Sequence, residues 1–204
     1  MSTLAVVVGG LSAESSTARL ATTIAKEVGA DDVITIQLRD YAHELTDMAL
    51  TGMPGAHLRE AFEAIARADG VIVAAPVYNA APLGVATLFL QMLDDAMLCS
   101  MPVLIAGTGG TTRHSLALDT HIRPLISYLK GLPMPTTIFV ATEDWGASEQ
   151  DTHMRARIKQ GAAELREHMA LRETRDTTPV DDLDPDSVVP FADLLSAASP
   201  KPEQ

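Results

Sequence analysis

The chain has 204 residues, which is enough for a single domain with one hydrophobic core. Hydrophobic residues make up 47% of it and charged residues only 21%, a composition that excludes a disordered chain. The net charge of −12 would repel nucleic-acid phosphates, and no apolar stretch approaches the roughly 18 residues of a membrane span. The one cysteine cannot form an internal disulfide, and no secretory signal precedes the first apolar run. We therefore expect a soluble, cytoplasmic protein that binds neither nucleic acid nor membrane.

Short apolar runs alternate with amphipathic segments along the whole chain. The predicted strands are Leu4 to Val8, Val33 to Leu38, Val71 to Ala74, Val103 to Ala106 and Thr137 to Ala141. The predicted helices have apolar faces that run from Leu20 to Val28, Leu58 to Ile65, Gly84 to Leu93, Leu118 to Leu129 and Met154 to Met169. Residues 41 to 57, with two glycines and a proline, are interpreted as a long connection.

This alternation predicts an α/β fold with right-handed crossovers. A doubly wound parallel sheet of five strands in the order 2-1-3-4-5 is a common solution for it. We assign residues 1 to 172 to this domain. Residues 173 to 204, with five prolines and eight acidic side chains against two basic ones, form an acidic, proline-rich C-terminal tail. Ligands of such sheets gather at the carboxyl ends of the strands, so the loops there are the candidate site.

The loop after the first strand, residues 9 to 17, is rich in glycine and hydroxyl side chains. Its serines precede a helix, and free N–H groups and the helix dipole at such a position favour a phosphate. The loop has neither the glycine spacing of a dinucleotide fingerprint nor the lysine of a triphosphate-binding loop, so it fits a monophosphate. A helix cap without any ligand is an equally good interpretation of this loop alone.

Two further loops follow strands at the same sheet edge. In residues 75 to 84, two prolines stiffen the chain, and Tyr78 and Asn79 offer a ring and an amide to a flat heterocycle. The alternative is a rigid turn in which Tyr78 packs against its neighbours. In residues 107 to 114, three glycines allow the backbone to approach a planar ligand closely, or simply form a tight turn.

Taken together, the three loops resemble the NADPH-dependent FMN reductase family, over roughly residues 4 to 171. The family's first motif, G-S-x-R-x-x-S-x-N/S-x-x-L, has its counterparts in Gly9, Ser15, Thr17 and Leu20. Its second resembles Pro76 to Asn79 followed by Gly84 to Thr87, and its third Thr108 to Gly110, His114, Asp119 and Arg123-Pro124. The chain departs from the family at Gly10, Ser12 and Thr87, where Ser, Arg and Lys are usual. The nearest branch supplies reduced flavin to luciferase-like or alkanesulfonate monooxygenases.

The resemblance implies a flavodoxin-like oxidoreductase that transfers hydride from NADPH or NADH to N5 of FMN, without a catalytic side chain or a metal. It implies that the FMN phosphate is held by Ser12, Ser15, Ser16 and Thr17. The flavin ring would be bordered by Pro76, Val77, Tyr78, Asn79, Thr108, Gly109 and Gly110, with His114 adjacent. It further implies a homodimer or homotetramer that delivers reduced FMN to a separate flavin-dependent monooxygenase.

Two alternatives use the same fold. A quinone or azo reductase would keep FMN bound and pass electrons to an external acceptor, whereas a flavodoxin-type electron carrier would bind FMN without oxidising NADPH. Individual residues also have alternatives: His114 could cap the helix that follows it, and Trp145 could shield the ring, although we expect it in a subunit interface.

Overall fold

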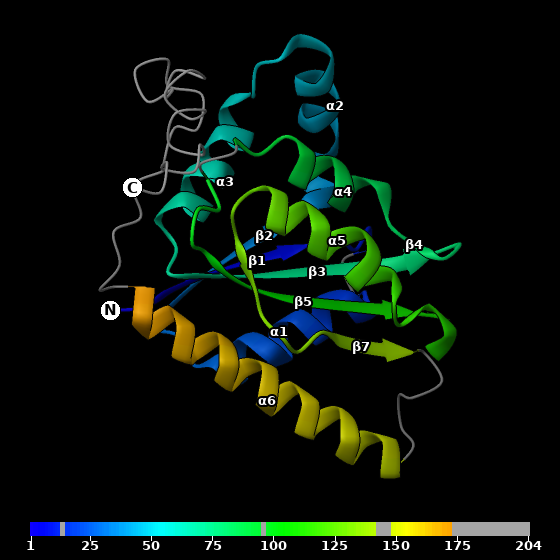
Figure 1. The fold of residues 1–204 in the computed structure, drawn as a ribbon. Coiled ribbons are helices and arrows are strands. Elements are labelled where there is room, and N and C mark those ends of the chain that lie inside the picture. Colours follow the sequence, from blue (N-terminus) through cyan, green and yellow to red (C-terminus); the bar gives the residue numbers. More distant parts are fainter. Residues whose placement is uncertain (13–14, 95–96, 142–147, 173–204) are drawn as a thin grey trace, which may run out of the picture.

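The structure is a computed structural model that describes residues 1–12, 15–94, 97–141 and 148–172. Figure 1 shows a central sheet with helices on both faces. Its long, mutually parallel strands are β1 (Thr3–Val8), β2 (Asp32–Gln37), β3 (Gly70–Tyr78), β5 (Pro102–Gly109) and β7 (Ile138–Ala141). The α-helices are α1 (Ser16–Val28), α2 (Ala42–Thr51), α3 (Ala56–Arg67), α4 (Gly84–Gln91), α5 (Ala117–Tyr128) and α6 (Ser148–Arg172). Within these described ranges no helix is long and apolar enough to cross a membrane.

The sheet has seven strands among the described residues, in the order β2-β1-β3-β5-β6, with β7 also paired to β5 and β4 to β3. The predicted α/β class and parallel sheet are confirmed, but the prediction of five strands in the order 2-1-3-4-5 is incomplete. The extra strands, β4 (Ala81–Pro82) and β6 (Leu132–Pro133), are two residues long. Two residues are too few to show a hydrophobic period, so strands this short cannot be predicted from it. They form only where a neighbouring strand, distant in sequence or across a turn, offers a free edge.

Two apolar cores lie on opposite faces of the sheet. One face is covered by α2, α3, α4 and α5, and the other by α1 and α6. β3 is buried along eight of its nine residues and β5 along its whole length, which explains why their sequences are continuous apolar runs without alternation.

The interpretation of residues 41 to 57 as a connection is wrong, because this segment contains α2 and the start of α3. Leu45 anchors α2 in the core, and Gly52 (φ 75°) ends the helix in the left-handed region. Glu44 of α2 accepts a hydrogen bond from the Leu58 N–H of α3, and a Cβ on Gly55 would collide with its carboxylate. The glycines that indicated a loop are therefore helix ends.

Candidate functional site

The chain leaves two neighbouring strands in opposite directions at their carboxyl ends. β1 ends at Val8, paired with Ala74, and leads to α1 on one face, whereas β3 continues to Tyr78 and leads to α4 on the other. A crevice opens where neighbouring strands diverge in this way. Here it is a cavity of about 530 Å³, lined by Gly10, Leu11, Ser12, Ser15, Ser16, Thr17, Pro76, Val77, Tyr78, Thr108, Gly109 and Gly110.

The cavity brings all three predicted loops together, and ten of the twelve predicted site residues line it. Asn79 does not: with φ values of 49° and 65°, Asn79 and Ala80 form the two-residue turn between β3 and β4, a conformation that Asn tolerates. The prediction left out Gly10 and Leu11, which line the cavity from the first loop. Their place between residues already selected was the only available signal.

His114 is also outside the cavity lining. It ends a short 3-10 helix, η2 (Thr112–His114), and its buried Nδ1 has no hydrogen-bond partner among the residues that the structure describes. The alternative role as a cap of the next helix is wrong, because the N-cap residue of α5 is Leu116 and no side chain caps it. Trp145 lies outside the described residues.

One side of the cavity is the N-terminus of α1, where the sequence predicts the phosphate. Ser15 is the N-cap, and its Oγ accepts a 3.0 Å hydrogen bond from the Ala18 N–H, as its position before the helix predicts. The first turn of α1 holds no acidic residue, so within that turn the helix end favours an anion. The Ser15 hydroxyl proton is not used by this cap and can be donated to a ligand.

The missing side chain of Gly10 makes this arrangement possible. A Cβ at Gly10 would overlap the Ser15 side chain. Any side chain at position 10 would therefore compete with Ser15 for this space in the structure.

The other end of the cavity is formed by β3 and β5. Pro76 lies beyond the end of β1, so its missing N–H breaks no ladder bond there, and its carbonyl accepts from the Leu83 N–H at 2.9 Å. Pro76 and Val77 are buried, whereas Tyr78 is 60% exposed. The alternative in which Tyr78 packs against its neighbours is therefore wrong, and its ring is free to contact a ligand.

Two adjacent glycines at this end have different reasons to be glycine. A Cβ on Gly109 would come within 2.8 Å of the Phe139 ring, so protein packing requires that glycine. A Cβ on Gly110 would meet no described atom within 4 Å, and Gly110 has no positive φ. Gly110 therefore faces open space inside a site, as expected where a ligand approaches the backbone.

Comparisons with known proteins agree with this geometry. The family model for NADPH-dependent FMN reductase matches residues 2–146. The chain belongs to this family. An FMN reductase (NADPH) of Pseudomonas aeruginosa is 32% identical over 142 residues, 68% of this chain and 76% of that protein. An NADH-dependent FMN reductase, SfnF, of Pseudomonas fluorescens is 33% identical over 62% of this chain and 68% of its own.

The fold comparison is equally direct. An oxidoreductase from Corynebacterium diphtheriae superposes with a TM-score of 0.79 at 37% identity, over 84% of this chain and 98% of that one. The fold of the reductase is thus flavodoxin-like, and the chain is an NAD(P)H-dependent FMN oxidoreductase. Its being an enzyme excludes the alternative of a non-enzymatic electron carrier.

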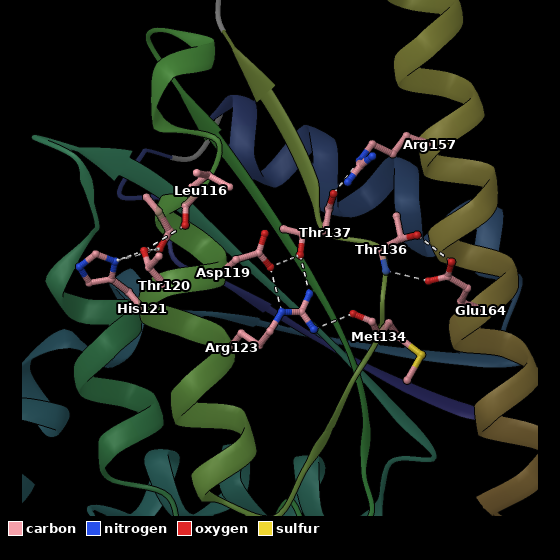
Figure 2. A network of polar contacts seen from close by, with 11 residues as sticks. Leu116, Asp119, Thr120, His121, Arg123, Met134, Thr136, Thr137, Arg157 and Glu164 are labelled. Atoms are coloured by element: carbon pink, nitrogen blue, oxygen red, sulfur yellow. Dashed lines mark hydrogen bonds and ion pairs between the residues drawn. The ribbon is translucent and has the colours of Figure 1, made fainter.

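Two further motif residues of the reductase, Asp119 and Arg123, lie outside the cavity lining and have a structural role (Figure 2). Arg123 donates to Asp119 Oδ1 at 2.9 Å, to the Met134 carbonyl at 2.9 Å and to Thr137 Oγ1 at 2.7 Å. Thr137 donates in turn to Asp119 Oδ1 at 2.6 Å. The ring of contacts ties α5 to the segment that enters β7.

Proposed function

We propose that this cavity binds FMN, with the phosphate at the N-terminus of α1 and the ring between Tyr78 and Gly110. The observation that carries the proposal is a single cavity with a different surface at each end. One end offers N–H groups and hydroxyls without an acid, and the other offers an exposed aromatic ring beside an open glycine. Its volume of about 530 Å³ is in the usual range for sites of such ligands.

FMN supplies the redox chemistry when bound, by accepting hydride from nicotinamide at N5. The chain supplies binding and orientation: Ser12, Ser15, Ser16 and Thr17 hold the phosphate, and Pro76 to Tyr78 with Thr108 to Gly110 border the ring. Hydride transfer itself needs no side-chain acid. Asn79 and His114 lie outside the lining, so their predicted places beside the ring stay predictions.

NADPH or NADH is the hydride donor in this proposal. The relatives include both an NADPH-dependent and an NADH-dependent reductase, and this chain has Thr87 where the family usually has Lys. We propose that reduced FMN then leaves for a separate flavin-dependent monooxygenase. The exposure of Tyr78 at the mouth supports exchange of the flavin. We assign the catalytic domain to residues 1 to 172; residues 173 to 204, the predicted acidic, proline-rich tail, lie outside the described residues.

One spectrophotometric assay tests the proposal. Purified protein is mixed with NADPH or NADH, with and without FMN, and the nicotinamide absorbance is followed. We expect a loss of absorbance that requires both protein and FMN, and its absence with both nucleotides would overturn the proposed reaction. Higher kcat/KM with quinones or azo dyes than with FMN would instead support the quinone or azo reductase with a resident flavin.

A glycine pair tests the location of the ring. Gly110→Ala should leave the unliganded fold intact, because its Cβ meets nothing, yet it should weaken FMN binding about tenfold or more by crowding the ring. Gly84→Ala is the matched control, because a Cβ there also meets nothing within 4 Å and Gly84 is outside the lining. Kd for FMN is measured by flavin fluorescence. Equal affinity of the two variants would place the ring elsewhere.

A further inference from the structure

Two buried hydroxyl groups meet at the floor of the cavity. Thr17 Oγ1 of α1 and Thr108 Oγ1 of β5 are 2.7 Å apart, although the residues are 91 positions apart in the chain. The two threonines are only 1% and 4% exposed, yet both line the cavity. The bond therefore joins the loop that we propose to hold the phosphate to the third loop, at two residues that line the cavity.

The bonding of Thr17 differs from that of five other helical threonines among the described residues. Donation to the carbonyl four residues earlier is found at Thr22, Thr23, Thr46, Thr51 and Thr120. Thr17 is bonded to another hydroxyl instead, and either oxygen can be the donor. Two hydroxyls carry two protons and their mutual bond uses one. Within the described ranges, no acceptor is found for the second proton, so the pair has one donor left for a ligand.

We propose that Thr108 is a positioning residue that donates to Thr17, so that the Thr17 hydroxyl donates to the FMN phosphate. This inference rests on the proposed FMN site. Thr17 lies in the first turn of α1, beside the N–H groups that favour the phosphate. An ionised phosphate oxygen only accepts hydrogen bonds, so Thr17 must donate to it and must then accept from Thr108.

The direction of the hydrogen bond between the two hydroxyls determines how Thr108 affects FMN binding. In a chain of hydrogen bonds each donor polarises the next, so the Thr108 bond strengthens the Thr17 bond to the phosphate. Riboflavin has the ring and the ribityl chain of FMN but no phosphate. The pair should therefore raise the affinity for FMN relative to riboflavin, although Thr108 belongs to the loop that borders the ring.

The test measures Kd for FMN and riboflavin in the full-length protein and its variants. Thr108→Val keeps the side-chain shape and should weaken FMN about 3- to 10-fold while leaving riboflavin unchanged. Thr108→Ser should restore the FMN affinity. Thr17→Val should lose more FMN affinity than Thr108→Val, and Thr17→Val with Thr108→Val should lose no more than Thr17→Val alone.

The ratio of the two affinities decides the outcome. If Thr108→Val weakens both flavins equally, or weakens neither, Thr108 has no role at the phosphate and the inference is overturned. Thermal unfolding of the unliganded variants checks that each is folded. A wild-type protein that does not bind FMN would overturn the proposed function as well, whereas one that binds FMN but gives no such change of ratio in Thr108→Val would overturn this inference alone.

Discussion

Gly10 and Ser15 form a pair in which the absence of one side chain permits the position of the other. The Ser15 hydroxyl caps α1 from the space where a Gly10 side chain would lie. A sequence shows both residue types, but only the fold shows that they share one space.

Gly10→Ala should therefore destabilise the unliganded protein by about 1–2 kcal/mol, because the new methyl group displaces the Ser15 cap. Ser15→Ala alone should cost about 1 kcal/mol. In the Ser15→Ala background the same Gly10 substitution should cost less, since the cap is already absent. Urea unfolding of the four proteins measures this coupling. Strict additivity of the two substitutions would show that they do not compete for space.

At the scale of elements, the segment between β6 and β7 is held by side chains from helices on both faces (Figure 2). Val103 of β5 pairs with Pro133, and Ala106 of β5 pairs with Ile138. The four residues 134 to 137 therefore lie opposite only two residues of β5 and are not part of the regular ladder. Thr136 donates through its N–H (2.9 Å) and its hydroxyl (2.7 Å) to the two carboxylate oxygens of Glu164 on α6. Polar side chains therefore replace the bonds that this strand interruption removes.

The Glu164 contact predicts a pH dependence. Burial acts to raise the pKa of Glu164, but the hydrogen bonds from Thr136 and Gln160 and the nearby His168 outweigh it and hold the pKa below 4.5. The stabilisation is therefore present above pH 4.5 and is lost as the pH falls through the folded-state pKa. Glu164→Gln should cost about 1 kcal/mol near pH 7 and less near pH 3.

Chemical unfolding at both pH values measures this difference, with Glu167→Gln, an exposed position on the same helix, as the control. A cost of Glu164→Gln that does not change with pH would contradict the assignment. Glu167→Gln should have little effect at either pH, because surface substitutions without buried partners change stability by only a few tenths of a kcal/mol.

The elements also separate what a sequence can predict from what it cannot. The long strands are predictable because burial on both faces gives continuous apolar runs, and α1 because Ser15 precedes a regular apolar face. The connection between β2 and β3 is not predictable, since glycines such as Gly52 and Gly55 are common both in loops and at helix ends. These two glycines are helix ends here because Leu45 is buried in the core and Glu44 accepts a hydrogen bond from α3.

At the scale of the whole molecule, the site is more predictable than its internal contacts. Parallel strands bring their carboxyl ends to one edge, so three loops with suitable residues must converge there. The bond between Thr17 and Thr108 depends on the rotation of α1 against β5, and no local pattern reports that rotation. The mononucleotide site could be predicted from this convergence and the reaction from the resemblance to a known family, whereas the contact between Thr17 and Thr108 required the fold.

The surface of α4 bears on the oligomeric state of the protein. Its sequence, Gly84–Gln91, contains no charged residue, although Val85, Leu88 and the following Met92 are only partly buried. Its polar side chains are Thr87 and Gln91, and neighbouring apolar side chains that stay partly exposed on one helix indicate a contact surface. We propose that a second copy covers α4, which agrees with the expected homodimer or homotetramer.

Light scattering should then give two or four times the chain mass of 21.7 kDa. Val85→Lys should lower this mass to that of one chain, because an ammonium group is costly to bury without a partner. Thr23→Lys, on the exposed surface of α1, should leave the mass unchanged. Circular dichroism checks that both variants are folded. A wild-type protein with the mass of one chain at micromolar concentration, or a folded Val85→Lys variant with the wild-type mass, would exclude α4 as the interface.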